Sequence, residues 1–129
     1  MEKKLYNLRV NPSFQILIPP LTDEEYRMLE ESIVRDGCDM PLVVWNGTIV
    51  DGHNRYNICQ KHGIPFAYEE RSFASDDDAM FWMLEHQLAR RNLNAYQRSV
   101  LILKFEPMIR KRASANKKWA SKDNVLKGQ

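Results

Sequence analysis

The sequence predicts one α+β domain, in which helices pack against a small mixed β-sheet and a helical extension follows at the C-terminus. The chain has 129 residues, a length that suits one domain with one core. Short apolar and β-branched runs bounded by turn residues predict the strands. Apolar residues at helical spacing, preceded by capping residues, predict the helices between them.

The predicted strands are short and lie in the first half of the chain. The residues 14–18 form an apolar run that Pro19 and Pro20 stop. Asn46-Gly47 is the strongest two-residue signal for a β-hairpin and fixes the central pair of strands. We expect four strands in one mixed sheet, at residues 14–18, 42–46, 48–51 and 65–71.

Capping signals place the predicted helices. Thr22 with Glu25 three residues later forms a capping box, and Ser75 precedes three aspartates that suit the positive end of a helix dipole. Pro107 is expected to kink or interrupt the last helix, and residues 116–129 are expected to form a frayed basic tail. The helices are expected at about residues 22–37, 53–62, 75–91 and 94–105.

Composition excludes several classes of protein. The net charge is only +2, so the chain as a whole is not a strongly basic nucleic-acid binder. Cys38 and Cys59 form neither a CxxC pair nor a cluster with zinc spacing, so we expect two buried thiols in a reducing compartment. The N-terminus has no apolar signal core and no segment is long enough to span a membrane, so we expect a cytoplasmic protein without a membrane partner.

The basic residues are unevenly distributed. Between residues 104 and 122 there are seven lysines and arginines against one acid, Glu106. A solvated helix surface and a DNA-contacting face both explain such a run. If the second explanation holds, weak phosphate contacts are expected from Arg110, Lys111, Arg112, Lys117 and Lys118.

The segment Asp51-Gly52-His53-Asn54-Arg55 ends a predicted strand and opens a predicted helix. Such a junction leaves backbone N–H groups unpaired at the positive end of the helix, where they bind anions. Gly52 lets an anion approach the backbone, His53 and Asn54 add donors, and Arg55 offers a bidentate phosphate contact. The alternative is a tight turn with a surface arginine. Three donors gathered at one helix N-terminus favour the anion site.

A second polar cluster spans the end of one predicted helix and the start of the next. His86 and Arg90 share a helix face at i, i+4, and Arg91 follows directly. Two interpretations remain open for the arginines: they complement the helix dipole, or they form a second phosphate contact.

Three sequence boxes in this order resemble the N-terminal domain of ParB-type partition proteins, in the superfamily that also holds sulfiredoxin and a free-serine kinase. The first box starts at Leu21, where an acidic amphipathic helix ending in Arg35-Asp36-Gly37 leads to residues 40–44, and it resembles the family stretch "SIKExGxxxPIxV". Residues 50–56 stand at the phosphate-binding "GERR" box. Residues 90–94 stand at the "QRxxLxPxE" box. The match covers about residues 14–105, so the resemblance divides the chain into a ParB N-terminal-like domain, 1–105, and a basic helical extension or linker, 106–129.

The resemblance implies a nucleotide site between the second and third boxes, for CTP or for ATP/ADP. Gly52 and Arg55 map onto the box that cradles phosphates. In sulfiredoxin the matching turn carries the catalytic cysteine. His53 stands there in this chain, so sulfinic-acid reduction is not expected.

The resemblance also implies a Mg²⁺ site, but this chain departs from the pattern. In partition proteins a Glu-Asn pair opens the third box and holds the metal ion. Here His86 and Gln87 stand in its place and Glu85 is one residue off, which leaves three weak metal-ligand candidates.

Two readings of function follow. The favoured one is a nucleotide-binding module of a DNA-associated protein of a partition system, plasmid, phage or mobile element, with DNA read by a helix-turn-helix domain that this chain does not contain. The alternative is a small-molecule kinase or nucleotide hydrolase of the same superfamily, with Asp51 and His53 as catalytic candidates. Paired carboxylates at two-metal spacing, which a nuclease would need, are not evident. Homodimer formation stays open.

Overall fold

The computed structural model describes residues 2–90 and 93–127, with side chains described up to residue 114. The chain forms two compact units, residues 1–74 and 75–129. Within the described parts, no helix is both long and apolar enough to cross a membrane.

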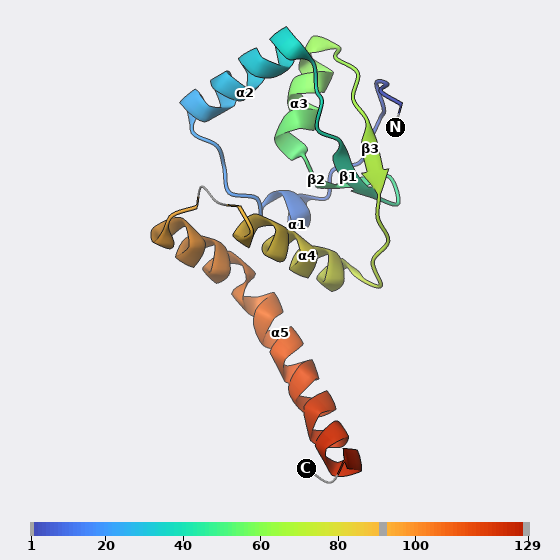
Figure 1. The fold of residues 1–129 in the computed structure, drawn as a ribbon, viewed down its shortest axis with the longest axis vertical. Coiled ribbons are helices and arrows are strands. Elements are labelled where there is room, and N and C mark those ends of the chain that lie inside the picture. The colour runs from blue at the N-terminus through green and yellow to red at the C-terminus, as the bar shows by residue number, and fades with distance from the viewer. Residues whose placement is uncertain (1, 91–92, 128–129) are drawn as a thin grey trace. The chain divides into compact units, whose positions relative to one another are not determined.

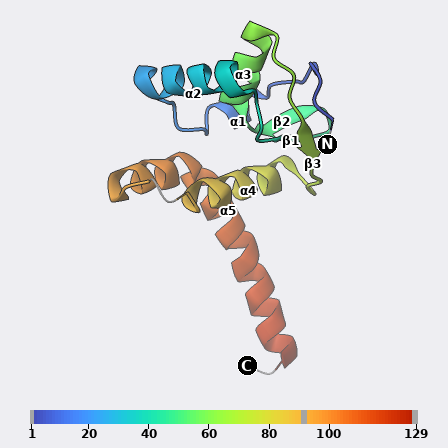
Figure 2. The same ribbon diagram turned by 45° about the horizontal axis from the view of Figure 1, so that its top comes forward.

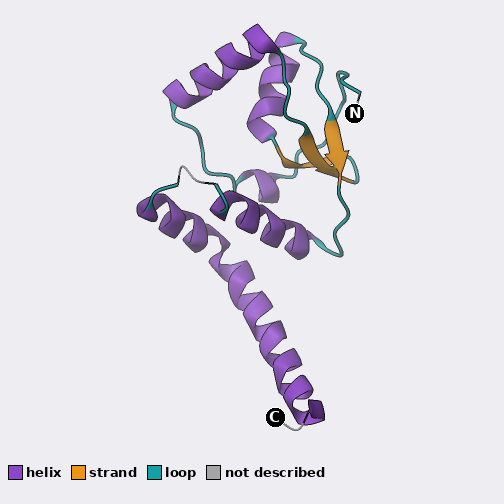
Figure 3. Ribbon diagram, viewed as in Figure 1, coloured by secondary structure: helices purple, strands orange, loops and turns teal. Residues whose placement is uncertain are grey.

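The first unit contains a three-stranded mixed sheet, which confirms the predicted α+β class (Figures 1 and 3). The strand order is β2-β1-β3, with β1 antiparallel to β2 and parallel to β3. The elements of this unit are, in chain order, α1 (Pro12–Gln15), α2 (Asp23–Asp36), β1 (Leu42–Trp45), β2 (Thr48–Asp51), α3 (His53–His62) and β3 (Tyr68–Glu70).

The predicted strand at residues 14–18 is wrong, because residues 12–15 form α1. The side chain of Asn11 accepts a hydrogen bond from the Ser13 N–H at 2.9 Å, and Pro12 occupies the first helical turn. Proline at that position suits a helix, since its missing N–H would have no partner there. Only Phe14 of this helix is buried, so the apolar run was too short for its periodicity to separate helix from strand.

The hairpin forms as predicted. Asn46 and Gly47 both have positive φ, 51° and 76°, the conformation that a two-residue turn between twisted strands requires. The Asn46 N–H donates to the Glu70 carboxylate at 3.0 Å, which ties the turn to the end of β3. The predicted strand at 65–71 is shorter than expected, and Phe66 instead forms an isolated bridge with Lys4.

Helices α2 and α3 lie side by side in both views and share a core with the sheet (Figures 1 and 2). The predicted capping box is present at the start of α2, between Thr22 and Glu25. Cys38 and Cys59 are both buried and unbridged, as expected. Burial, together with the neighbouring Cys38, raises the pKa of the Cys59 thiol to about 12. The core side chains are Ile33, Cys38, Leu42, Ile49, Ile58, Cys59 and Phe66.

The second unit consists of α4 (Asp76–Leu88) and α5 (Ala95–Lys127), which contact each other. Ser75 caps α4 as predicted, and a reciprocal pair of Asn94 and Gln97 hydrogen bonds caps α5. Pro107 lies inside α5, and Figures 1 and 2 show that this helix changes direction along its length. Proline removes one helical hydrogen bond and crowds the preceding turn, which accounts for a bend without a break.

The prediction of a frayed tail from residue 116 is wrong for the backbone, because α5 continues to Lys127. The fading apolar pattern shows only that this stretch lacks a regular buried stripe. Alanine and lysine favour helix by intrinsic propensity, and extending an existing helix avoids the cost of nucleation.

Candidate phosphate-binding site

The junction of β2 and α3 requires glycine at position 52. Gly52 has φ 105° and ψ 26°, a left-handed conformation that other residues rarely adopt. A Cβ atom here would lie 2.7 Å from Leu42 Cγ, and Leu42 is fully buried. Gly52 therefore lets the chain turn from β2 directly into α3 against the core.

The N-terminus of α3 has no side-chain cap among the described residues. Side chains do cap α1, α2 and α4, where Asn11, Thr22 and Ser75 accept hydrogen bonds from first-turn N–H groups. The first N–H groups of a helix have no partner within the helix, and the helix dipole is positive there. The start of α3 is therefore suited to an anion.

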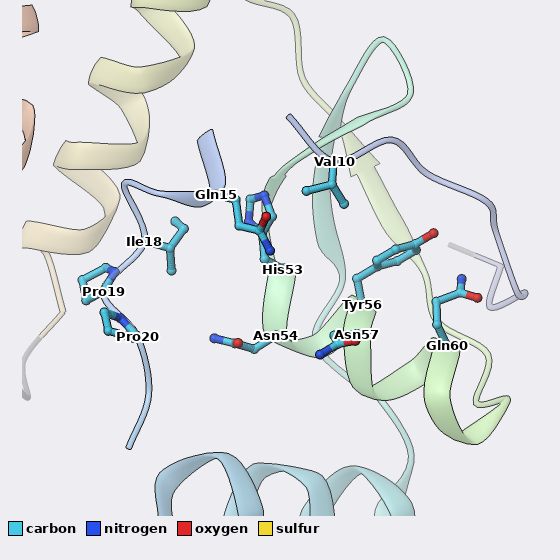
Figure 4. Close-up of a pocket in the computed structure, with 10 residues that line it drawn as sticks. All are labelled: Val10, Gln15, Ile18, Pro19, Pro20, His53, Asn54, Tyr56, Asn57 and Gln60. Atoms are coloured by element: carbon cyan, nitrogen blue, oxygen red, sulfur yellow. The ribbon is translucent and has the colours of Figure 1, made fainter. Parts of the chain in front are cut away.

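A pocket of about 400 Å³ lies along one side of α3, from its first turn at His53 to Gln60. Figure 4 shows its wall of Ile18, Pro19 and Pro20 facing the side of α3. Sequence reasoning found His53 and Asn54 but missed the rest, although Asn57 and Gln60 follow His53 at helical spacing. The lining residues are Val10, Gln15, Ile18, Pro19, Pro20, His53, Asn54, Tyr56, Asn57 and Gln60.

His53 is the most unusual residue in this lining. Only 8% of it is exposed, yet neither ring nitrogen has a hydrogen-bond partner. Burial lowers the pKa of the His53 imidazole, and the nearby charge of Asp51 opposes that shift. The side chain is therefore a buried, neutral imidazole that lines a pocket at a helix N-terminus.

Arg55 is largely engaged within the protein. Its guanidinium pairs with the Asp51 carboxylate at 3.0 Å, and Nη1 donates to the backbone carbonyls of Met40 and Pro41 at 3.0 Å each. At least three of its five N–H donors are thus used. Arg55 does not line the pocket, and its contacts join the start of α3 to the segment that leads into β1. The predicted phosphate contact of Arg55 stays a prediction.

The candidates of the third box lie in the second unit, at the end of α4. The ring of His86 stacks on Trp82 with 4.7 Å between centroids, and buried Gln87 accepts a hydrogen bond from Arg90 at 3.2 Å. Arg91 lies outside the described residues. The phosphate role proposed for both arginines stays a prediction.

These residues do not fit a Mg²⁺ site. Magnesium prefers an octahedral set of oxygen ligands, and of Glu85, His86 and Gln87 only Glu85 supplies a carboxylate. The Gln87 side-chain oxygen already accepts from Arg90. Across the described residues, no group of three or more His, Cys, Asp or Glu is arranged to hold a metal ion.

Three of the basic residues predicted to contact DNA have acidic partners within the second unit. Lys111 pairs with Asp77 at 2.6 Å, and Arg112 pairs with Asp78 at 2.8 Å. Arg110 pairs with Glu106 one helical turn away, at 2.5 Å. The sequence analysis counted acids only along the basic run and so missed those of α4. The side chains of Lys117 and Lys118 lie outside the described residues.

Comparison with solved structures identifies the fold of this chain. No family model matches the chain, and no curated protein matches it. The C2221 crystal form of a pNOB8-like ParB N-domain superposes with a TM-score of 0.72 at 25% identity, over 89% of this chain and 48% of that one. A second structure of the pNOB8-like ParB N-domain gives 0.67 at 23% identity, over 95% of this chain and 47% of that one.

A C-terminally truncated chromosome-partitioning ParB from Caulobacter crescentus, complexed with CTP-γ-S, also matches. It gives a TM-score of 0.57 at 22% identity, over 81% of this chain and 64% of that one. The predicted resemblance is confirmed: the chain has the fold of a ParB N-terminal domain. It spans about half the length of the two pNOB8-like chains.

Proposed function

We propose that this chain is a nucleotide-binding module of a partition-type, DNA-associated protein, and that it binds nucleotide phosphates at the N-terminus of α3. One observation carries the proposal. His53, buried and without hydrogen-bond partners, lines a pocket of about 400 Å³ at a helix start that no side chain caps. Buried polar atoms are nearly always bonded in folded proteins, so a ligand that bonds His53 would remove the exception.

The pocket suits a phosphorylated organic molecule. Its volume lies within the usual range for small-molecule sites. The first-turn N–H groups of α3 and the side chains of His53 and Asn54 supply donors for phosphate oxygens. Ile18, Pro19 and Pro20 offer an apolar wall to the rest of the ligand. Gln15 offers an amide, whereas the amide nitrogens of Asn57 and Gln60 already donate to Tyr26 and to the Tyr6 carbonyl, so these two side chains offer their oxygens.

The nucleotide is the favoured ligand because of the fold. The Caulobacter ParB structure of this fold holds CTP-γ-S. In this chain a ligand of the same class, CTP or ATP/ADP, would place its phosphates at the uncapped N-terminus of α3. Under this hypothesis, DNA would be read by a separate helix-turn-helix domain.

Binding is favoured over the alternative of a kinase or nucleotide hydrolase. Phosphoryl transfer needs a metal ion and a group that positions the attacking oxygen. One of the two catalytic candidates, Asp51, pairs its carboxylate with Arg55. The side chains of Asp51 and Arg55 are largely buried, with exposed fractions of 18% and 16%. That arrangement points to a structural role for Asp51 in the junction.

A charge placed at the pocket separates binding from folding. Asn54→Asp adds an acid to the first turn of α3, which suits the helix dipole and should leave stability equal or higher. The same acid should repel phosphate and weaken nucleotide binding at least tenfold. Asn7→Asp is the matched control, because it adds the same charge at an exposed residue outside the pocket.

The measurement is calorimetric titration and thermal unfolding with CTP, ATP, ADP, GTP and UTP. A nucleotide at a hundred times its dissociation constant should stabilise the parent chain by about 2.7 kcal/mol. Equal affinity of Asn54→Asp and Asn7→Asp would place the ligand elsewhere. A panel in which no nucleotide binds would refute the proposal itself.

A further inference from the structure

The imidazole of His53 can take up a proton as well as donate a hydrogen bond to an anion. A neutral imidazole has one N–H donor and one nitrogen lone pair. A fully ionised phosphate only accepts hydrogen bonds. Such a phosphate can therefore bond His53 only at a ring nitrogen that carries a proton.

Few groups around His53 could take up the proton in its place. The other lining residues from α1, α3 and the segment 18–20 are apolar or neutral amides, apart from Tyr56. The Tyr56 hydroxyl is hydrogen-bonded to the backbone of Leu8. At the end of β2, Asp51 carries the nearby negative charge, and Arg55 is paired with it.

Without a ligand, two influences keep His53 neutral. Burial disfavours the charged ring, and the positive end of the α3 dipole does the same. A phosphate dianion in the pocket reverses the balance, because two negative charges next to the ring stabilise the imidazolium. One ring N–H then donates to a phosphate oxygen, and the charge of the dianion offsets the cost of burying the charged ring.

We propose that His53 couples phosphate binding to the uptake of one proton, so that the pocket selects a fully ionised phosphate and holds it more tightly as the pH falls. This inference rests on the proposed function. The step is balanced: one proton from solvent joins the imidazole as one phosphate group enters, and no covalent bond of the ligand changes.

The test uses the complete chain and two ligands. The first is the nucleotide that binds best, and the second is inorganic sulfate, which stays fully ionised throughout the range in which histidine titrates. Titration calorimetry in buffers of different ionisation enthalpy measures the number of protons taken up. Because sulfate itself does not titrate, any proton taken up with it belongs to the protein.

For the parent chain we expect uptake approaching one proton, and an affinity that falls by up to about tenfold per pH unit between the lowered pKa of His53 in the free chain and its raised pKa in the complex. His53→Gln should bind more weakly, without proton uptake and without that pH dependence. His62→Gln removes a histidine at the other end of α3, outside the pocket, and should behave as the parent does.

Each outcome decides between the proposals. Binding of nucleotide and sulfate without proton uptake would overturn the role of His53 and leave the binding site standing. Uptake that persists in His53→Gln would also overturn it, because another group would then carry the proton. Absence of binding by either ligand at every pH would remove both proposals.

A second measurement covers the case in which His53→Gln fails to fold. Nuclear magnetic resonance of the imidazole nitrogens in the parent chain follows the protonation of His53 directly. The pKa of His53 should rise when sulfate is added. A pKa of His53 that does not respond to sulfate would refute the inference.

Discussion

Substituting Gly52 by alanine tests how strictly the junction of β2 and α3 is built. Gly52 has φ 105°, and a left-handed backbone costs a residue with a Cβ atom about 1–2 kcal/mol. The added methyl would also lie 2.7 Å from Leu42 Cγ and 3.2 Å from Arg55 Nη2. Overpacking of a core costs about 1–3 kcal/mol more. We therefore expect Gly52→Ala to lower the free energy of unfolding by about 2–5 kcal/mol.

Gly63→Ala is the matched control for this experiment. Gly63 also has positive φ, 67°, but a Cβ atom there would meet nothing within 4 Å. It should cost only the conformational part, about 1–2 kcal/mol. Urea unfolding followed by circular dichroism measures both values, provided that the denaturant slope is unchanged.

The steric contact between position 52 and Leu42 can be tested separately. Shortening Leu42 to alanine removes the atom with which the new methyl collides, so Gly52→Ala should cost less in that background than in the parent chain. A double-mutant cycle measures the difference. If Gly52→Ala cost no more than Gly63→Ala, the contact with Leu42 would not be what restricts position 52 to glycine.

The remaining predictions concern the clamp that Arg55 forms with Asp51, the Cys59 thiol and DNA. Arg55→Ala should destabilise the chain by on the order of 3 kcal/mol, because it removes the largely buried ion pair with Asp51. Exposed Arg35→Ala should cost under about 1 kcal/mol in the same urea assay, and equal costs would contradict the clamp. Cys59, with a pKa of about 12, should resist iodoacetamide at pH 8 in the native chain and react in denaturant; rapid native labelling would show an accessible thiol. DNA binding by the chain alone should be weak in gel-shift titrations, and the logarithm of the affinity should fall with the logarithm of the salt concentration with a slope of about −0.9 per phosphate neutralised. Removal of residues 113–129 should abolish most of this binding. Tight, salt-insensitive binding to one DNA sequence would refute this prediction.

Local signals in the sequence predicted most of the fold. The Asn46-Gly47 turn, the Thr22 capping box and the Ser75 cap each depend on residues within four positions, and each is present in the structure. The two errors arose where the local signal was ambiguous. The four apolar residues among positions 14–18 are too few to show a period, and a polar helix such as the end of α5 leaves no apolar stripe in the sequence.

The candidate site was predictable only in part, because its side chains depend on contacts between distant residues. The junction at Gly52 could be predicted, because the sequence places a strand, a glycine and a helix in direct succession. The engagement of Arg55 with Met40 and Pro41 cannot be read from the sequence, since those carbonyls lie 14 and 15 residues away. The pairing of Lys111 with Asp77 was missed for the same reason.

The distribution of charge around the junction bears on how the pocket could bind anions. Asp51 and Arg55 neutralise each other next to it, and the ten lining residues include no lysine, arginine, aspartate or glutamate. Attraction for phosphate would then come from backbone dipoles at the start of α3 and from any proton that His53 acquires. Dipoles act at short range, within the first turn. Nucleotide affinity should therefore depend less on ionic strength than binding by a lysine-rich surface, where counterion release dominates.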